Sequence, residues 1–161
     1  MSIRDYLQNR HIGFELFLQR PAATASRRAQ NVHVPGRHVA KGVLVSAGER
    51  FVLAVLPATT RIDLRLLSQV LDVGTVRVAT EDEVGLVFAD CERGAIPPFG
   101  RPYGLSTVVE ASLAESVELL CVGNQRHEGV RLRFSDYEAV EAPLRAHFAV
   151  ANDPTPRRRA G

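Results

Sequence analysis

Val39-Ala40-Lys41-Gly42-Val43-Leu44-Val45 is the most informative segment of the chain. Its odd and even positions are both apolar or small, which is typical of a strand buried on both faces. Lys41 interrupts the pattern, and it is the only lysine among the 20 basic residues of the protein. Two interpretations of Lys41 stand: an ammonium that reaches water from a strand end, or a functional point charge for which a planar guanidinium is no substitute.

Gly94-Ala95-Ile96-Pro97-Pro98-Phe99-Gly100 is the second unusual segment. Its prolines restrict the backbone, while its glycines permit close approach or a positive φ. Such a loop can direct backbone N–H groups at an anion or a developing oxyanion. Taken alone, it also fits a proline-stiffened connection. Together with the strand lysine, it favours a site for a carbonyl or phosphate group.

Length and composition predict one ordinary globular domain. The chain has 161 residues, of which 45% are hydrophobic and 24% charged, so we expect a domain over residues 1–150 and a disordered Pro/Arg-rich tail over 151–161. No apolar run approaches the roughly 18–20 residues that span a bilayer, and the first residues lack a signal-peptide core. A cytoplasmic protein without a membrane partner is therefore expected, and its two distant cysteines should be free thiols.

The charge distribution argues against a protein that coats duplex DNA. The formal charge of +2 equals the contribution of Arg157, Arg158 and Arg159 with Asp153, which leaves 17 basic and 17 acidic residues in the rest of the chain. No predicted helix has a basic face. A protein that binds only the end of a nucleic acid remains compatible with this balance. The arginine tail fits either a phosphate-binding arm or a solubilising terminus.

The order of predicted elements indicates a mixed α/β fold. Irregularly interleaved strands and adjacent hairpins favour a mixed sheet or part-open barrel flanked by helices over a doubly wound parallel sheet. Capping boxes are predicted at Thr80–Glu83 and Ser135–Glu138. The expected helices cover residues 2–8, a segment starting at 24, 63–71, 80–88 and 135–148, and the expected strands cover 14–18, 39–45, 50–56, 75–79, 106–110, 118–122 and 130–134.

Familiar catalytic and metal-binding motifs are missing from the sequence. It contains no Gly-x-Ser-x-Gly, no His-Glu-x-x-His, no P-loop and no Gly-x-Gly-x-x-Gly. The five histidines show no zinc spacing with either cysteine, so no metal site is predicted. Cys91 precedes the glycine loop and is a candidate nucleophile, although no base can be paired with it. Cys121 fits a small core residue.

The two unusual segments carry a family resemblance. The segments 40–45, 54–57, 62–64, 94–100 and 123–132 occur in the order found in the YbaK/EbsC family, the free-standing relatives of the editing domain of bacterial prolyl-tRNA synthetases. The resemblance covers about residues 3–148. It implies a YbaK-like mixed sheet with surrounding helices, and an enzyme that hydrolyses the ester of a mischarged aminoacyl-tRNA in trans.

The same resemblance implies roles for particular residues. Lys41 matches the family lysine that contacts the terminal adenosine or its phosphate, and Gly94 begins the loop that holds the aminoacyl carbonyl. Water attacks directly, helped by a ribose hydroxyl, without metal, cofactor or covalent intermediate. The expected substrate-binding residues are Ala95, Ile96, Pro97, Pro98 and His127.

Other implications leave alternatives open. His127 is either a pocket residue or an exposed turn histidine, and Thr24 and Ser26 either border the pocket or cap a helix. Ile96, Phe99 and Val45 are candidates for the pocket lining that sets the edited amino acid. The expected partners are the aminoacyl-tRNA 3′ end and an aminoacyl-tRNA synthetase, with the protein a monomer or weak homodimer. The alternative function is a non-catalytic module that binds tRNA ends, nucleotides or a synthetase.

Overall fold

The computed structural model describes residues 2–18 and 36–152. The helices in these ranges are α1 (Ile3–Asn9), α3 (Leu64–Leu71), α4 (Glu81–Val87) and α5 (Phe134–Glu141), with short 3₁₀ turns η1 (Gly36–His38), η2 (Arg101–Tyr103) and η3 (Ala111–Glu115). The strands are β1 (Phe14–Leu18), β2 (Ala40–Ala47), β3 (Arg50–Pro57), β4 (Thr60–Ile62), β5 (Val76–Val78), β6 (Ser106–Glu110), β7 (Glu118–Val122), β8 (Glu128–Arg133), β9 (Leu144–Ala146) and β10 (Ala149–Ala151).

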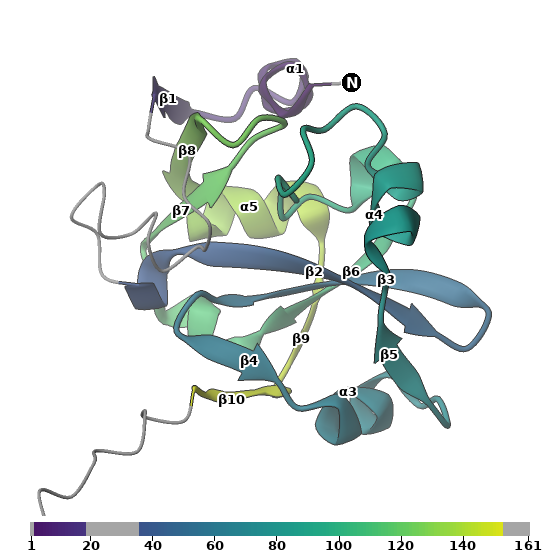
Figure 1. Ribbon diagram of the computed structural model, residues 1–161. Helices are drawn as coiled ribbons and strands as arrows, with labels where there is room; N and C mark the ends of the chain where they lie inside the picture. The colour runs from purple at the N-terminus through teal and green to yellow at the C-terminus, as the bar shows by residue number, and fades with distance from the viewer. Residues whose placement is uncertain (1, 19–35, 153–161) are drawn as a thin grey trace, which may run out of the picture.

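A five-stranded mixed sheet with the order β5-β2-β3-β6-β9 forms the centre of the molecule. β2 pairs antiparallel with β3 and β5, whereas the β3–β6 and β6–β9 pairs are parallel. A three-stranded sheet (β1-β8-β7) lies on one side of β2 with α1 and α5, and the β10–β4 pair lies on the other side with α3 (Figure 1). The predicted mixed α/β fold is confirmed, and its sheets do not close into a barrel.

The strand β2 separates two apolar clusters. Ala40 and Leu44 belong to the cluster shared with α1, α5, β7 and β8, whereas Val45 and Ala47 belong to the cluster shared with α3. Alternate side chains of a strand point to opposite faces. The near-continuous apolar pattern is therefore explained, because each face of β2 has its own core to fill.

Local capping signals place the first turns of three helices. The Ser2 hydroxyl accepts from Asp5 N at the start of α1, and the Asp63 carboxylate caps α3. Thr80 and Glu83 form the predicted capping box of α4. The predicted helices at 2–8, 63–71 and 80–88 are confirmed.

The predicted helix at 135–148 is wrong in both its start and its end. Its N-cap is Arg133, which makes no side-chain capping bond, so the predicted capping box does not form. The helix ends at Glu141, where Ala142 adopts φ +45°. Pro143 follows and has no N–H with which to continue a helix. The chain instead forms β9 and β10, which brings Phe148 fully into the core.

The short strand β4 was not among the predicted strands. Its residues Thr60–Ile62 pair with Ala149–Ala151 of β10. A strand of three residues has no detectable period, and only its distant partner reveals it.

Some predictions concern parts of the chain outside the described residues. They include the helix starting at 24 with Thr24 and Ser26, and the tail with its three arginines. The domain boundary at 150 stays a prediction. Within residues 2–18 and 36–152, no helix has the length and apolar character needed to cross a membrane.

Candidate active site

Lys41 lies near the start of β2, opposite Leu56 of β3. Its ammonium donates a hydrogen bond to the backbone oxygen of Thr60, in β4. The side chain is half-buried, and this burial lowers the pKa of Lys41. The strand lysine is thus a partly desolvated point charge whose ammonium has a main-chain acceptor.

The Gly94–Gly100 loop is tightly folded. Gly94 has φ +87°, a conformation that favours glycine, and Ala95 N donates to Glu92 O at 2.9 Å. Pro97 and Pro98 are buried. Their rings restrict the backbone between the exposed start of the loop and its buried end.

Few loop amides are available to a ligand. Ala95 N and Gly100 N have acceptors, and the prolines have no N–H. Within the described part of the chain, the amides of Gly94, Ile96 and Phe99 have no acceptor. Phe99 is fully buried, whereas Gly94 and Ile96 retain exposed surface. The oxyanion-binding prediction therefore narrows to these two amides.

The lysine strand and the glycine loop touch at Gly42. A Cβ atom added to Gly42 would lie 3.0 Å from Ile96 Cγ2 and 3.4 Å from Ile96 O. Only a residue without a side chain fits this close approach comfortably. Two segments separated by about fifty residues are thus neighbours in the fold, and Gly42 is their contact point.

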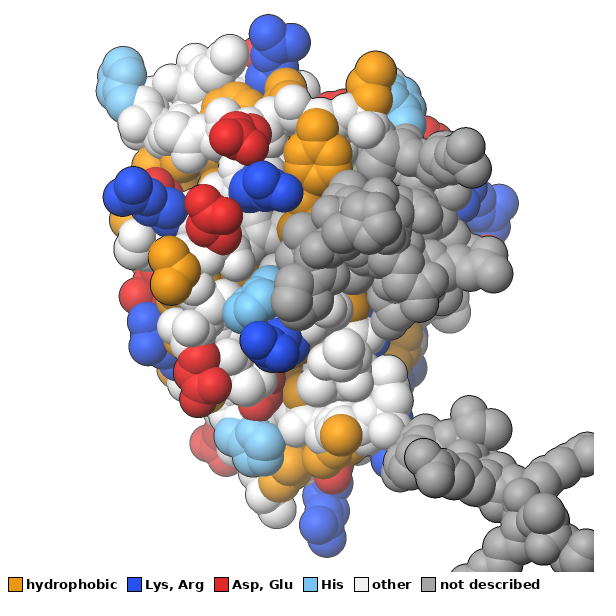
Figure 2. All heavy atoms as spheres, turned by 90° about the vertical axis from the view of Figure 1, so that its left-hand side faces the viewer, with side chains coloured by type: hydrophobic (Ala, Val, Ile, Leu, Met, Phe, Trp, Pro, Cys, Tyr) orange, Lys and Arg blue, Asp and Glu red, His pale blue; other side chains and the backbone are white. Residues whose placement is uncertain are grey.

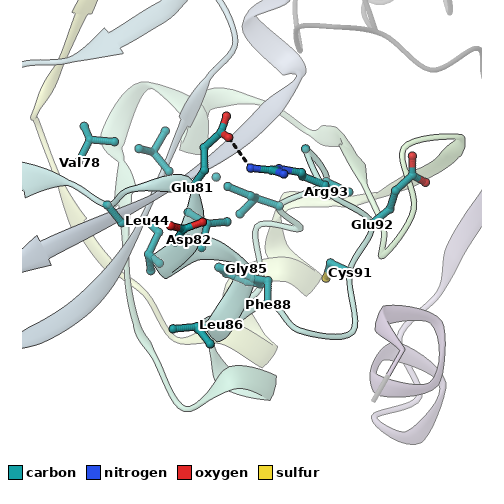
Figure 3. Close-up of a pocket in the computed structure, with 17 residues that line it drawn as sticks. Leu44, Val78, Glu81, Asp82, Gly85, Leu86, Phe88, Cys91, Glu92 and Arg93 are labelled. Atoms are coloured by element: carbon teal, nitrogen blue, oxygen red, sulfur yellow. Dashed lines mark hydrogen bonds and ion pairs between the residues drawn. The ribbon is translucent and has the colours of Figure 1, made fainter.

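A pocket of about 700 Å³ opens beside the loop. It lies between β2, β5, α4 and the loop that follows α4, as Figure 3 shows. Leu44, Val84 and Phe88 give it an apolar lining. Its volume is within the range of small-molecule sites in proteins.

The rim of the pocket is mainly acidic. Glu81, Asp82 and Glu92 contribute carboxylates. Arg93 donates from Nη2 to Glu81 Oε2 at 2.7 Å, the ion pair drawn in Figure 3. A pocket with this rim suits an aminoacyl group, which carries an ammonium, better than it suits a phosphate.

The structure brings only part of the predicted site to this pocket. Gly94, Ala95 and Ile96 line it, whereas Lys41 does not. Strand alternation explains the difference: Lys41 lies on the face of β2 opposite to Gly42 and points toward β4. The ammonium and the pocket are therefore on two sides of one strand.

Pro97, Pro98, Phe99 and Val45 do not line the pocket either. Phe99 packs in the cluster shared with α1 and α5, and Val45 in the cluster shared with α3. Which side chains contact an aminoacyl group stays a prediction. Ile96 is the member of that predicted set that reaches the pocket.

His127 is half-buried in the turn between β7 and β8. This turn packs against the glycine loop: Glu92 N donates to Asn124 O at 2.8 Å, and Arg126 N donates to Glu92 Oε2 at 3.2 Å. His127 itself does not line the pocket. The structure thus places its turn, but not its ring, at the site.

Arg126 borders the glycine loop and was not among the predicted site residues. Its Cδ lies 3.5 Å from the position of a Cβ on Gly94, so a guanidinium stem borders the first residue of the loop. Its position in the same turn as His127 was the available signal. A guanidinium there is suited to a phosphate or carboxylate.

Cys91 is poorly suited to act as a nucleophile, although it lines the pocket. Its Sγ lies 3.1 Å from the Tyr103 hydroxyl and accepts from Asn124 Nδ2 at 3.6 Å. Burial raises the pKa of the Cys91 thiol to about 11, so the reactive thiolate is scarce near neutral pH.

The described residues carry no excess of positive charge. Acidic and basic side chains intermingle on the side of the molecule that Figure 2 displays. Arg131 pairs with Glu15 at 3.6 Å. Residues 2–18 and 36–152 contain 14 basic and 17 acidic residues. Among the described residues, no cluster of three or more metal-ligating side chains occurs.

Comparisons with known proteins give one family match and several similar folds. A model of the aminoacyl-tRNA editing domain family matches residues 19–140. The fold is similar to that of a hypothetical protein (TM-score 0.84, 17% identity, 92% of this chain and 99% of that chain). It is also similar to a candidate trans-editing enzyme for prolyl-tRNA synthetase (TM-score 0.78, 20% identity, 92% and 95%). The comparison with curated proteins finds no match.

Proposed function

The chain belongs to the aminoacyl-tRNA editing domain family, and from this premise we propose that it hydrolyses the ester bond of a mischarged aminoacyl-tRNA. The membership confirms the resemblance that the lysine strand and glycine loop carry in the sequence. The observation that supports a working site is the contact between Gly42 and Ile96, which brings these two segments together.

The glycine loop supplies the oxyanion site in this proposal. The amides of Gly94 and Ile96 receive the carbonyl oxygen of the ester as it becomes negative. Water adds to the carbonyl carbon, the bond to the ribose oxygen breaks, and a proton returns to that oxygen. A ribose hydroxyl assists the water. The Cys91 thiol in the pocket is protonated near neutral pH and takes no part in this step.

Lys41 holds the tRNA end in this proposal. Its ammonium and the pocket lie on opposite sides of β2. We therefore place a phosphate of the terminal adenosine at Lys41 and the aminoacyl group at the glycine loop. The substrate between these two points passes Gly42. Thr60 O keeps the ammonium in place before binding.

The remaining predicted residues take supporting roles. Ala95 and Ile96 contact the aminoacyl group at the pocket wall. Pro97 and Pro98 hold the shape of the loop, and His127 lies in the turn that supports it. An aminoacyl-tRNA synthetase partner, a monomeric or weakly dimeric state and a cytoplasmic location are part of the same proposal.

The second candidate is a binding module without catalysis. The observation that favours it is the position of the Lys41 ammonium, which bonds to Thr60 O and stays outside the pocket. Such a module would bind tRNA ends, nucleotides or a synthetase on an unchanged fold.

Deacylation of a panel of mischarged tRNAs separates the two candidates. We expect the wild type to hydrolyse one or two substrates, and Lys41→Ala to lower kcat/KM by about 100-fold because a positioned charge is lost. Arg50→Ala is the control, since Arg50 is an exposed cation at the start of the next strand. If the wild type binds tRNA ends but cleaves no member of the panel, the deacylase proposal is wrong and the protein is a binding module.

A further inference from the structure

Glu141, at the end of α5, has a fully buried carboxylate that binds the glycine loop. Its side chain is 2% exposed. Oε2 accepts from Gly100 N at 2.9 Å and from Thr107 Oγ1 at 3.0 Å, and Oε1 accepts from the Tyr6 hydroxyl at 3.1 Å. One carboxylate thus joins the loop to β6 and to α1.

The C-terminal end of the loop, at Phe99 and Gly100, is tightly packed. A Cβ on Gly100 would lie 2.5 Å from Thr107 Oγ1, so only glycine fits at this position without a shift of its neighbours. The Phe99 ring packs edge-on between Tyr6, at 6.0 Å, and Tyr137, at 5.5 Å. The Glu141 backbone oxygen also accepts from Arg101 Nε at 3.0 Å.

Stability alone does not account for this arrangement. Burying a carboxylate is costly, and well-packed apolar residues often stabilise a core as well or better. Burial raises the pKa of Glu141, which reflects that cost. A geometric role explains why a hydrogen-bonded acid occupies the position.

We propose that Glu141 is the positioning residue of the Gly94–Gly100 loop, an inference that takes the proposed editing reaction as its premise. Glu141 fixes Gly100, and the restricted backbones of Pro97 and Pro98 pass this constraint to Ile96 and Gly94. The two free amides are thereby held where the ester carbonyl becomes charged. Glu141 touches no substrate atom.

Glu141→Met tests the inference with the substrate identified by the panel. Methionine has similar length but offers Gly100 N no comparable acceptor, so the loop end loses its anchor. We expect kcat to fall by about 10- to 100-fold, the effect of a small displacement of reacting groups. KM should change less than about twofold, because tRNA binding is not affected.

Glu141→Gln is the conservative variant that should restore activity. Its amide oxygen can accept from Gly100 N and Thr107 Oγ1, while its amide N–H donates to the Tyr6 oxygen, since a tyrosine hydroxyl both donates and accepts. We expect kcat within about threefold of the wild type, as the loop retains its acceptor.

Tyr6→Phe is the matched control for a purely structural effect. It removes a donor from the same carboxylate but leaves the ring against Phe99 and the bond to Gly100 intact. We expect a lower melting temperature with an unchanged kcat. If Tyr6→Phe and Glu141→Met lose activity in proportion to their loss of stability, the positioning role is overturned.

Amide exchange separates this inference from the proposed function. The amides of Phe99 and Gly100 should exchange faster with solvent in Glu141→Met and at the wild-type rate in Glu141→Gln. An inactive wild type would refute the editing function, while faster exchange would still support the anchoring of the loop. Unchanged exchange in Glu141→Met overturns the inference whatever the activity.

Discussion

At the scale of single residues, Gly94 and Gly48 form a natural pair for comparison. Both have a positive φ, +87° and +64°, which side chains rarely adopt. Nothing lies within 4 Å of a Cβ on Gly48, and the nearest atom to a Cβ on Gly94 is Arg126 Cδ at an ordinary 3.5 Å. An alanine at either position therefore meets backbone strain without a steric clash.

Gly94→Ala and Gly48→Ala should lose similar stability but differ in activity. Each should lower the free energy of unfolding by about 1–2 kcal/mol, the usual cost of a left-handed backbone for a residue with a Cβ. Gly94→Ala alone should abolish most deacylation, because it moves the first amide of the loop. Urea unfolding and deacylation assays measure both. An active Gly94→Ala protein would exclude the Gly94 amide from the reaction.

At the scale of elements, α4 is notable because it forms a wall of the pocket and begins with a charged network. Glu83 accepts from Thr80 N at 2.9 Å and from both terminal nitrogens of Arg77, at 2.7 and 3.0 Å. The bonds from Arg77, followed by the backbone bond from Thr80, lower the pKa of Glu83 from 4.5 to about 2. The start of this helix is therefore sensitive to acid.

Glu83→Gln should remove an acid-dependent part of the stability. A carboxylate whose pKa is depressed on folding stabilises the native state above its unfolded pKa, and loses that contribution as the pH falls through its folded pKa. The free energy of unfolding of the wild type should thus be larger than that of the variant at neutral pH. This difference in stability should shrink as the pH falls from 4.5 toward about 2. Urea unfolding across this range provides the measurement. A difference independent of pH would contradict the role assigned to the Glu83 charge.

At the scale of the whole molecule, the charge is unevenly divided. The described residues are net acidic, and the tail contributes Arg157, Arg158 and Arg159. Arginines add salt-dependent affinity for phosphates. The proposed editing reaction uses only the 3′ end of a tRNA, so we expect the arginines of the tail to contact phosphates elsewhere on the tRNA.

Truncation after Asn152 should weaken tRNA binding without affecting the chemistry. Loss of three phosphate contacts should reduce the slope of log K against log salt concentration by about 2. The kcat for a saturating substrate should remain at the wild-type level. Binding titrations at several salt concentrations test this expectation. An unchanged slope would assign the tail to solubility instead.

Local signals in the sequence predicted a large part of the fold. The apolar pattern of β2 indicated burial on both faces, and Ser2, Asp63 and Thr80 marked the starts of α1, α3 and α4. These features depend on residues a few positions apart, so the sequence contains their causes directly. The lysine strand, the glycine loop and three further segments, taken in their order and separation, indicated the family.

Long-range contacts determined the rest of the structure. β4 and β10 form because they pair with each other. The end of α5 is different, because Pro143 is a local signal in the sequence that the predicted longer helix overlooked. The face of β2 that carries Lys41, and the anchoring of Gly100 by Glu141, depend on partners from distant segments. Such contacts leave no period or spacing in the sequence, because they arise only when separate elements pack together.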